Sequence, residues 1–145
     1  DCYARSKTQL GSSKGWPETV TGDGYLSTNP ATSDFANWTK IIIGYCDGSL
    51  HQGYRKEPIS YKGEKLYFRG SLITRSHFKW IMNRYPQFKN ADQVIVTGSS
   101  AGGIATYLWT NYVRTLVTNT SNVISIPDSG IFLATKTYKT GIEAL

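Results

Sequence analysis

The chain has 145 residues, which is enough for one domain with a real core. Its apolar fraction of 39% and charged fraction of 18% are ordinary for a globular chain, and no apolar run approaches the length of a membrane span. Lys and Arg are scattered rather than clustered, so the net charge of +6 favours a merely solvated basic surface over a patch that attracts acidic polysaccharide, anionic lipid or nucleic acid.

The first half of the chain is rich in turn residues. Residues 1–30 are predicted to be loop, with one helical turn near Arg5–Leu10. Residues 39–46 form a short β-branched apolar run, TKIIIGYC, which predicts a buried strand. Residues 48–66 are polar and Gly-rich, so we expect a long loop of the kind that often carries function.

A long amphipathic helix is predicted at residues 70–85, and Pro86 closes it. The expected inward face follows the i, i+4, i+7, i+8 pattern. Its members are Ile73, His77, Trp80, Ile81 and Arg84.

The second half alternates strands and helices. Residues 93–97 and 122–127 are predicted strands, and residues 101–117 are a predicted helix between them. The expected inward stripe of that helix consists of Ile104, Tyr107, Leu108, Tyr112 and Leu116. This order implies parallel βαβ units in a doubly wound α/β sheet, in which ligands bind at the carboxyl ends of the strands.

The segment after the second strand matches the Gly-x-Ser-x-Gly nucleophile elbow. Gly98 and Gly102 would leave room for a tight strand-to-helix turn that lifts the Ser100 hydroxyl clear of the sheet. The backbone N–H of Ala101 would then be free to bind a developing oxyanion. The alternative is a Gly/Ser-rich structural turn, which could bind phosphate on its N–H groups.

A serine nucleophile needs a base and an orienting acid, and in this class of enzyme both follow the serine along the chain. His51 and His77 both precede Ser100, and no histidine follows it. We expect His77 to be a packed helix residue, whereas His51 and Asp47 are candidate pocket residues. Asp128 ends the third strand and is either a turn-capping residue or a pocket residue.

The cysteines and the N-glycosylation sequons give information about the cellular compartment of the protein. Cys2 and Cys46 could form one disulfide, although the partner of Cys2 could equally lie upstream of the chain. Two N-glycosylation sequons, at Asn37 and Asn119, fit a secreted or luminal protein. There is no CxxC motif or histidine cluster, so neither a metal nor a cofactor is predicted. The chain begins with Asp1, which suggests a processed or truncated product.

Eight segments in register resemble the pectin acetylesterase/Notum family over about residues 2–139. They are Cys2-x-x-Arg5 with Thr8, Leu10–Ser13, Gly24–Ser27 with Asn29-Pro30, Asn37-Trp38, Tyr45–Gly48, Leu66–Gly70, Gly98–Gly103, and Asp128–Gly130 with Phe132-Leu133. The resemblance implies an α/β-hydrolase fold, a Ser-Asp-His triad, and a secreted, disulfide-bonded enzyme that cleaves carboxylic esters. Ser100 matches the family nucleophile and Ala101 its oxyanion-hole donor.

Some residues of the family pattern have no counterpart in this sequence. The family's Gly-Gly-Trp oxyanion segment would lie just before Cys2, and its catalytic Asp and His would lie beyond Leu145. Asp128 matches a family position that is not the triad acid. In the family, Cys2 pairs near the missing N-terminal segment, so a bond between Cys2 and Cys46 is not expected. The chain is therefore interpreted as one incomplete α/β-hydrolase-like domain, residues 1–145.

Two functions remain open from the sequence. The first is a serine carboxylesterase that deacetylates a polysaccharide such as pectin, with a lipidated protein as the other substrate class. Its Asp and His would come from outside this segment, and Tyr54 and Tyr61 would be pocket walls. The second is a catalytically incomplete relative that serves as a structural or binding component of a larger assembly. Its partner would be the rest of the hydrolase polypeptide or other chains.

Overall fold

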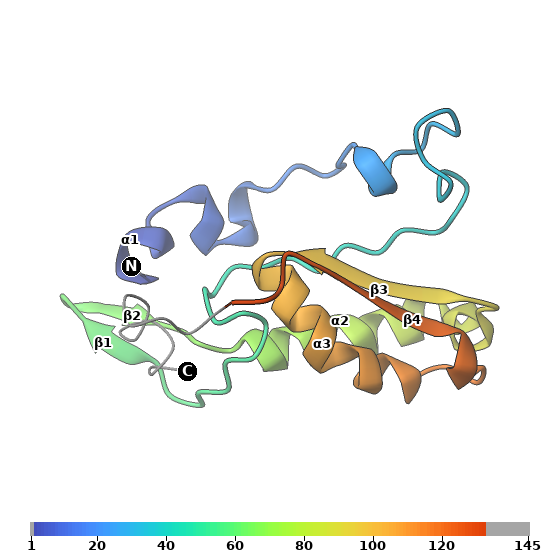
Figure 1. Cartoon of the computed structure of the whole chain (residues 1–145). Coiled ribbons are helices and arrows are strands. Elements are labelled where there is room, and N and C mark those ends of the chain that lie inside the picture. The colour runs from blue at the N-terminus through green and yellow to red at the C-terminus, as the bar shows by residue number, and fades with distance from the viewer. Residues whose placement is uncertain (1, 133–145) are drawn as a thin grey trace.

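The computed structural model of the chain describes residues 2–132, which form a mixed α/β arrangement (Figure 1). The longer elements are helices α2 (Gly70–Arg84) and α3 (Ala101–Arg114) and strands β3 (Val94–Ser99) and β4 (Val123–Asp128). The shorter ones are helix α1 (Cys2–Ser6), strands β1 (Ile59–Tyr61) and β2 (Glu64–Leu66), and 3-10 turns at Gln9–Gly11, Ser13–Gly15, Gly24–Leu26, Pro86–Asn90 and Thr120–Asn122.

The centre of the fold is a parallel β-α-β unit. Strand β3 pairs with β4 in parallel from Val94↔Val123 to Ser99↔Asp128, and α3 connects the two strands. Parallel pairing requires a crossover connection, and the helix that begins directly after β3 supplies it. The predicted strands at 93–97 and 122–127 and the helix between them are confirmed, although the helix ends at Arg114 rather than at 117.

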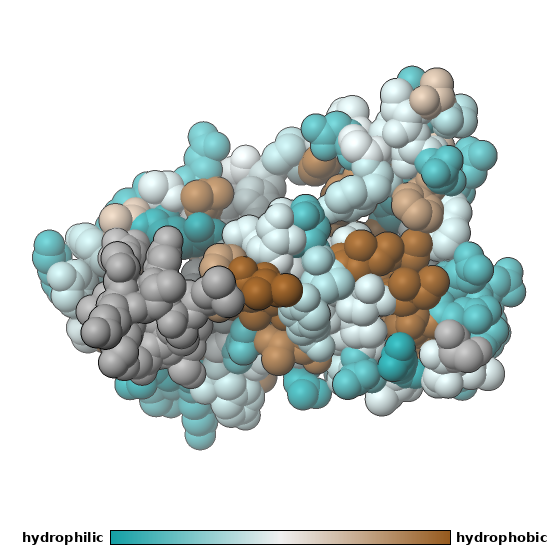
Figure 2. Space-filling view, in the orientation of Figure 1, coloured by the Kyte–Doolittle hydropathy of each residue, from teal (hydrophilic) through white to brown (hydrophobic). Residues whose placement is uncertain are grey.

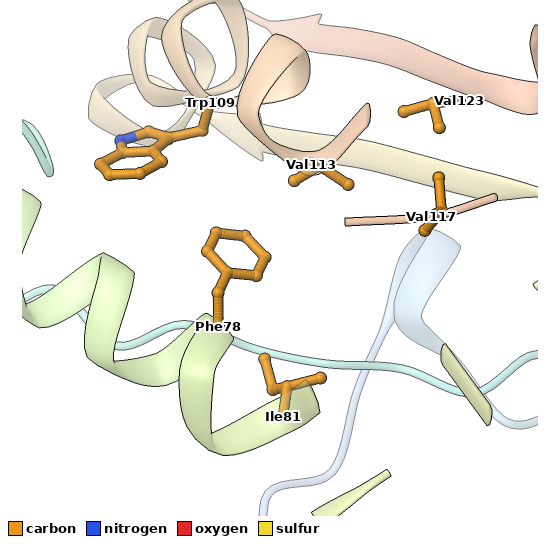
Figure 3. Packing of buried hydrophobic residues seen from close by; sticks show 6 residues of the cluster. All are labelled: Phe78, Ile81, Trp109, Val113, Val117 and Val123. Atoms are coloured by element: carbon orange, nitrogen blue, oxygen red, sulfur yellow. The ribbon is translucent and has the colours of Figure 1, made fainter. Parts of the chain in front are cut away.

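The hydrophobic core lies between α2, α3 and β4. Figure 3 shows Phe78 and Ile81 of α2 directed toward Trp109 and Val113 of α3. The same cluster includes Val117, which follows α3, and Val123 at the start of β4. Each aromatic ring in such a cluster buries a large apolar area, so this cluster holds α2 against the β-α-β unit.

The buried helix faces differ from the predicted ones. On α2 the buried residues are Gly70, Thr74, Phe78 and Ile81, so only Ile81 of the expected face is correct, and Trp80 is exposed. On α3 the buried residues are Gly103, Thr106, Trp109, Thr110 and Val113, while Tyr107 and Leu108 are half exposed. Threonines can line a buried face because their hydroxyls bond the helix itself, as Thr106 Oγ1 donates to Gly102 O (2.9 Å) and Thr110 Oγ1 to Thr106 O (2.6 Å).

Two predictions for the first half of the chain were wrong. Residues 39–46 belong to no strand among the described residues, and Ile41 and Ile42 are exposed while Ile43 packs against the core. A strand exists only through its hydrogen-bonded ladder, and no described strand pairs with this segment. The predicted loop 48–66 instead contains an antiparallel hairpin, β1 and β2, joined by Lys62-Gly63.

We predict that Phe78→Ala lowers the free energy of unfolding by about 3–5 kcal/mol, because it empties a fully packed aromatic site. Trp80→Ala, two residues away on the exposed face, should cost under about 1 kcal/mol. Urea-induced unfolding of both variants measures the difference. Equal losses would mean that α2 buries the face containing Trp80.

Candidate active site

Ser100 stands at the corner between β3 and α3. Strand β3 ends at Ser99, helix α3 begins at Ala101, and Ser100 between them is exposed. Its backbone has φ 56° and ψ −114°, a conformation that L-residues rarely adopt and that costs on the order of 1–3 kcal/mol. Strain of this kind is typical of the sharp turn that presents a nucleophilic serine.

The corner is held by the end of β4. The N–H of Ser100 donates to the carbonyl of Asp128 (3.0 Å), which extends the parallel ladder by one residue past Ser99↔Asp128. On the helix side, Ile104 N–H donates to the Ser100 carbonyl (3.1 Å). The backbone on both sides of Ser100 is therefore fixed, while its Oγ bonds no residue in the described part of the chain.

The first turn of α3 leaves backbone donors available. Ser100 makes no side-chain cap, and the N–H of Ala101 has no partner among residues 2–132. Free N–H groups and the positive end of the helix dipole lie at the same place. An anion, or an oxygen that gains negative charge, would be stabilised at this position.

Glycines allow backbone segments to pack closely at this corner, but only one of the two glycines predicted from the sequence, Gly98, is required for it. A Cβ at Gly98 would lie 2.7 Å from the backbone carbonyl group of Gly102, so position 98 must lack a side chain. A Cβ at Gly102 itself would meet nothing within 4 Å. The crowded helix position is Gly103, where a Cβ would lie 2.5 Å from Asp128 O and 2.7 Å from Gly130 Cα.

Sequence reasoning missed Gly103 and Gly130. The Gly-Gly pair at 102–103 and the Asp-Ser-Gly bend were visible, but nothing in the pattern showed that they meet. In the structure a Cβ at Gly130 would lie 2.5 Å from the Gly103 backbone. This mutual contact brings the start of α3 against the exit of β4.

Asp128 stabilises the turn through its backbone carbonyl and its carboxylate. Its carbonyl accepts the Ser100 N–H, and its carboxylate Oδ1 accepts the Ser129 hydroxyl (3.0 Å). Ser129 has φ 49°, in the left-handed region. The side chain is exposed at the carboxyl end of β4, and no hydrogen bond joins it to the Ser100 hydroxyl.

His51 and Asp47 lie in a tight loop that packs on α2 and α3 rather than on Ser100. His51 Nδ1 lies 3.4 Å from Thr74 Oγ1, and the His51 carbonyl accepts the Trp109 indole N–H (3.1 Å). The imidazole stacks on Tyr45 with 4.8 Å between ring centroids. Asp47 accepts the backbone N–H (3.1 Å) and the hydroxyl (2.5 Å) of Ser49, so both residues organise this loop.

His77 is held within its own helix, where Nδ1 lies 2.9 Å from the Ile73 carbonyl. The imidazole is half buried, which agrees with the packed role expected for it.

Both sequons lie at the surface. The Asn37 side chain is exposed beside Trp38, and the Asn119 side chain is exposed just before the 3-10 turn Thr120–Asn122.

Cys2 and Cys46 are both free thiols, and both line a cavity of about 340 Å³ between α1 and β2. Burial raises the pKa of the Cys46 thiol, and the Asp47 carboxylate adds to the effect. None of the residues around this cavity belongs to the Ser100 corner. Among residues 2–132, no cluster of His, Cys, Asp and Glu could hold a metal ion, and no helix is both long and apolar enough to cross a bilayer.

We predict opposite effects for the two neighbouring glycines of α3. Gly103→Ala should lower the free energy of unfolding by about 1–3 kcal/mol, because its Cβ collides with the backbone of β4. Gly102→Ala should leave stability unchanged or raise it by up to about 1 kcal/mol, since its Cβ meets open space. Thermal unfolding compares the pair, and a loss at Gly102 as large as at Gly103 would contradict this packing.

We also predict that His51 makes stability depend on pH. Burial lowers its pKa, nearby His77 lowers it further, and Asp47 partly opposes both. The unfolded chain therefore binds a proton at His51 more readily than the folded chain does. The His51 contribution to the free energy of unfolding is fully present above the ordinary histidine pKa of about 6.5 and is lost as the pH falls below it. Urea unfolding between pH 7.5 and pH 5 measures the slope. His51→Gln should flatten it, and an unchanged slope would exclude His51 as its source.

Comparison with known proteins gives a consistent set of relatives. The family described as pectinacetylesterase matches residues 1–144. The chain is 37% identical over 133 residues to pectin acetylesterase 5 of Arabidopsis thaliana, covering 91% of this chain and 30% of that protein. It is 33% identical over 146 residues to palmitoleoyl-protein carboxylesterase NOTUM of Mus musculus, covering 96% of this chain and 28% of that protein.

The structural comparison agrees. The Wnt deacylase Notum from Drosophila matches with a TM-score of 0.77 and 30% sequence identity, covering 91% of this chain and 40% of that one. The chain thus spans less than a third of the length of the two curated relatives described above.

Proposed function

Because the chain belongs to the pectin acetylesterase family, we propose that it carries the nucleophile of a serine carboxylesterase, with Ser100 as the attacking residue. The observation that carries the proposal is the strained, exposed backbone of Ser100 at the β3–α3 corner. The proposed whole is an α/β-hydrolase with a doubly wound sheet, of which β3 and β4 would be two parallel strands.

The proposed reaction is acyl transfer through a covalent intermediate. Ser100 Oγ attacks the ester carbonyl carbon and gives its proton to a histidine, which passes it to the departing alcohol. The Ala101 N–H donates to the oxyanion, a contact worth about 3 kcal/mol in the transition state. A water molecule then attacks the acyl-serine by the same proton route and releases the acid.

The base and the orienting acid are proposed to come from polypeptide outside this segment. The His51 imidazole contacts Thr74 Oγ1 and stacks on Tyr45, and the Asp128 carboxylate accepts the Ser129 hydroxyl, so neither residue supports a triad with Ser100. In this proposal the segment is part of one larger domain, which is consistent with relatives more than three times as long.

Acetylated polysaccharide is the proposed substrate class, in line with the plant relative named pectin acetylesterase. A fatty acyl group on a protein is the alternative, in line with the palmitoleoyl-protein carboxylesterase relative. We further propose that the protein is secreted or luminal, with glycans on the exposed Asn37 and Asn119, and with disulfides that involve polypeptide outside this segment.

A second candidate function is a relative without catalysis that acts as a binding or structural component. It is favoured by one observation: no histidine or carboxylate of residues 2–132 bonds the Ser100 hydroxyl.

We predict that a fluorophosphonate labels the naturally produced polypeptide at Ser100, because the reagent requires an activated serine hydroxyl. Ser100→Ala should abolish labelling and reduce acetate release from acetylated pectin by a factor of about 10⁴ or more. Ser99→Ala, at the adjacent exposed serine, is the matched control and should keep most of the labelling and most of the acetate release. Equal labelling of the wild type and Ser100→Ala would exclude Ser100, and labelling of neither would favour the non-catalytic relative.

A further inference from the structure

Two exposed serines with left-handed backbones lie side by side at the carboxyl ends of β3 and β4. The parallel register ends at Ser99↔Asp128, so the next residue is Ser100 on one chain segment and Ser129 on the other. Ser100 has φ 56° and Ser129 has φ 49°, a region that residues other than glycine rarely occupy. Both residues are exposed, and the junction of β4 with the start of α3 lies at the surface of the molecule in Figure 2. The strain at the candidate nucleophile therefore has a direct counterpart on the neighbouring strand.

Ser129 lies between two contacts that its chain segment makes with the Ser100 corner. The residue before it, Asp128, accepts the Ser100 N–H at its carbonyl (3.0 Å). The residue after it, Gly130, packs so closely on the first turn of α3 that a Cβ at Gly103 would lie 2.7 Å from the Gly130 Cα. Figure 1 shows β4 leaving the sheet beside the start of this helix. The end of β4 thus contacts the corner both at the serine and at the helix.

The left-handed backbone of Ser129 allows both contacts to form at once. An extended residue at this position would carry the chain about 3.3 Å further along the strand direction. A left-handed residue instead turns the chain, so that Gly130 reaches α3 directly after the Asp128 carbonyl has closed the ladder. The Ser129 hydroxyl donates to Asp128 Oδ1 (3.0 Å) and bonds no group of α3 within residues 2–132. Any influence of Ser129 on Ser100 therefore passes through the backbone.

We propose that Ser129 is a positioning residue for the nucleophile, acting through its left-handed backbone rather than through contact with the substrate. In this conformation the bend at residues 128–130 keeps Ser100 in its strained turn and keeps the Ala101 N–H in place for the oxyanion. The inference rests on the proposed function, since Ser100 must be the attacking residue for its position to affect the rate. A misplacement of about 1 Å at such a site can cost about 10²-fold in rate.

The test compares substitutions at Ser129 that differ in how well they tolerate a left-handed backbone. Ser129→Gly removes the hydroxyl and adopts the conformation freely, whereas Ser129→Val removes the hydroxyl and resists the conformation because Val is β-branched. The difference between these two variants isolates the backbone from the side chain. Ser129→Ala is a milder second variant in case Val prevents folding.

Lys62→Val is the matched control. Lys62 has φ 51° at the hairpin turn between β1 and β2, so this substitution introduces the same kind of backbone strain at another place in the fold. Within residues 2–132, no hydrogen bond joins Lys62 to β3, β4 or α3. A loss of activity that follows from strain in general would therefore appear in this control as well.

Hydrolysis of p-nitrophenyl acetate by the naturally produced polypeptide should separate these variants. We expect Ser129→Val to lower kcat about 10²-fold and Ser129→Ala about 10-fold, with KM within about twofold of the wild type. Ser129→Gly and Lys62→Val should keep kcat within about threefold of the wild type, although Lys62→Val should unfold at a lower temperature. Equal losses of kcat in the Gly and Val variants would overturn the inference, because they would assign the effect to the lost hydroxyl.

Hydrogen exchange separates this inference from the proposed function, because it reports on the corner whether or not the protein is active. Exchange of the Ser100 amide, followed by mass spectrometry, depends on its bond to the Asp128 carbonyl. The exchange should be faster in Ser129→Val than in the wild type and unchanged in Ser129→Gly. If exchange follows this order while Ser100 takes no fluorophosphonate label, Ser129 positions the corner and the esterase proposal fails. If Ser100 takes the label and its exchange is equal in all variants, the positioning inference fails alone.

Discussion

Helix α3 packs against the exit of β4 where Gly103 meets Gly130, and the geometry of Ser100 depends on this contact. Gly103 and Gly130 lack side chains at the point where the helix meets the strand exit, and the Ser100 N–H bonds the Asp128 carbonyl. These contacts act on both sides of one residue, so they can hold it in a backbone conformation that costs on the order of 1–3 kcal/mol. A larger residue at either glycine would push the helix away and relax the corner.

The hydrophobic packing behind the Ser100 corner also stabilises the backbone geometry of that residue. The cluster of Phe78, Trp109 and Val113 fixes α2 against α3 over the middle of the helix. The loop that carries His51 joins this cluster through the Trp109 indole, so it braces α3 from a third direction. A helix held along its length presents its first turn, and the free N–H of Ala101, in one orientation. Donors held in advance in this way stabilise developing charge without reorganisation.

The Ser100 corner and the β1–β2 hairpin differ in their charged groups. Among residues 2–132 no hydrogen bond or salt bridge joins a cationic side chain to Ser100, so the electrostatics of the corner come from the first turn of α3. The hairpin, by contrast, combines Lys62, Lys65 and Arg69 with tyrosine rings.

The sequence by itself determined the local elements of the second half and their order. The apolar runs at 93–97 and 122–127, the Gly-Ser-Ser-Ala-Gly turn and the helix after it were readable because each depends on nearby residues. The family resemblance, confirmed by the match over residues 1–144, was readable from motifs in register.

Only the tertiary structure decided which faces are buried and which segments meet. The buried stripes of α2 and α3 contain Gly and Thr, which hydrophobic periodicity does not count, while Trp80 and Tyr107 point outward. Residues 39–46 lack a strand because pairing requires a partner that the local pattern does not specify. The placement of His51 against Trp109, the contact of Gly103 with Gly130, and the joining of Tyr3 to the hairpin all link residues distant in sequence. Such contacts are set by how the elements pack, and this information is not local to any one of them.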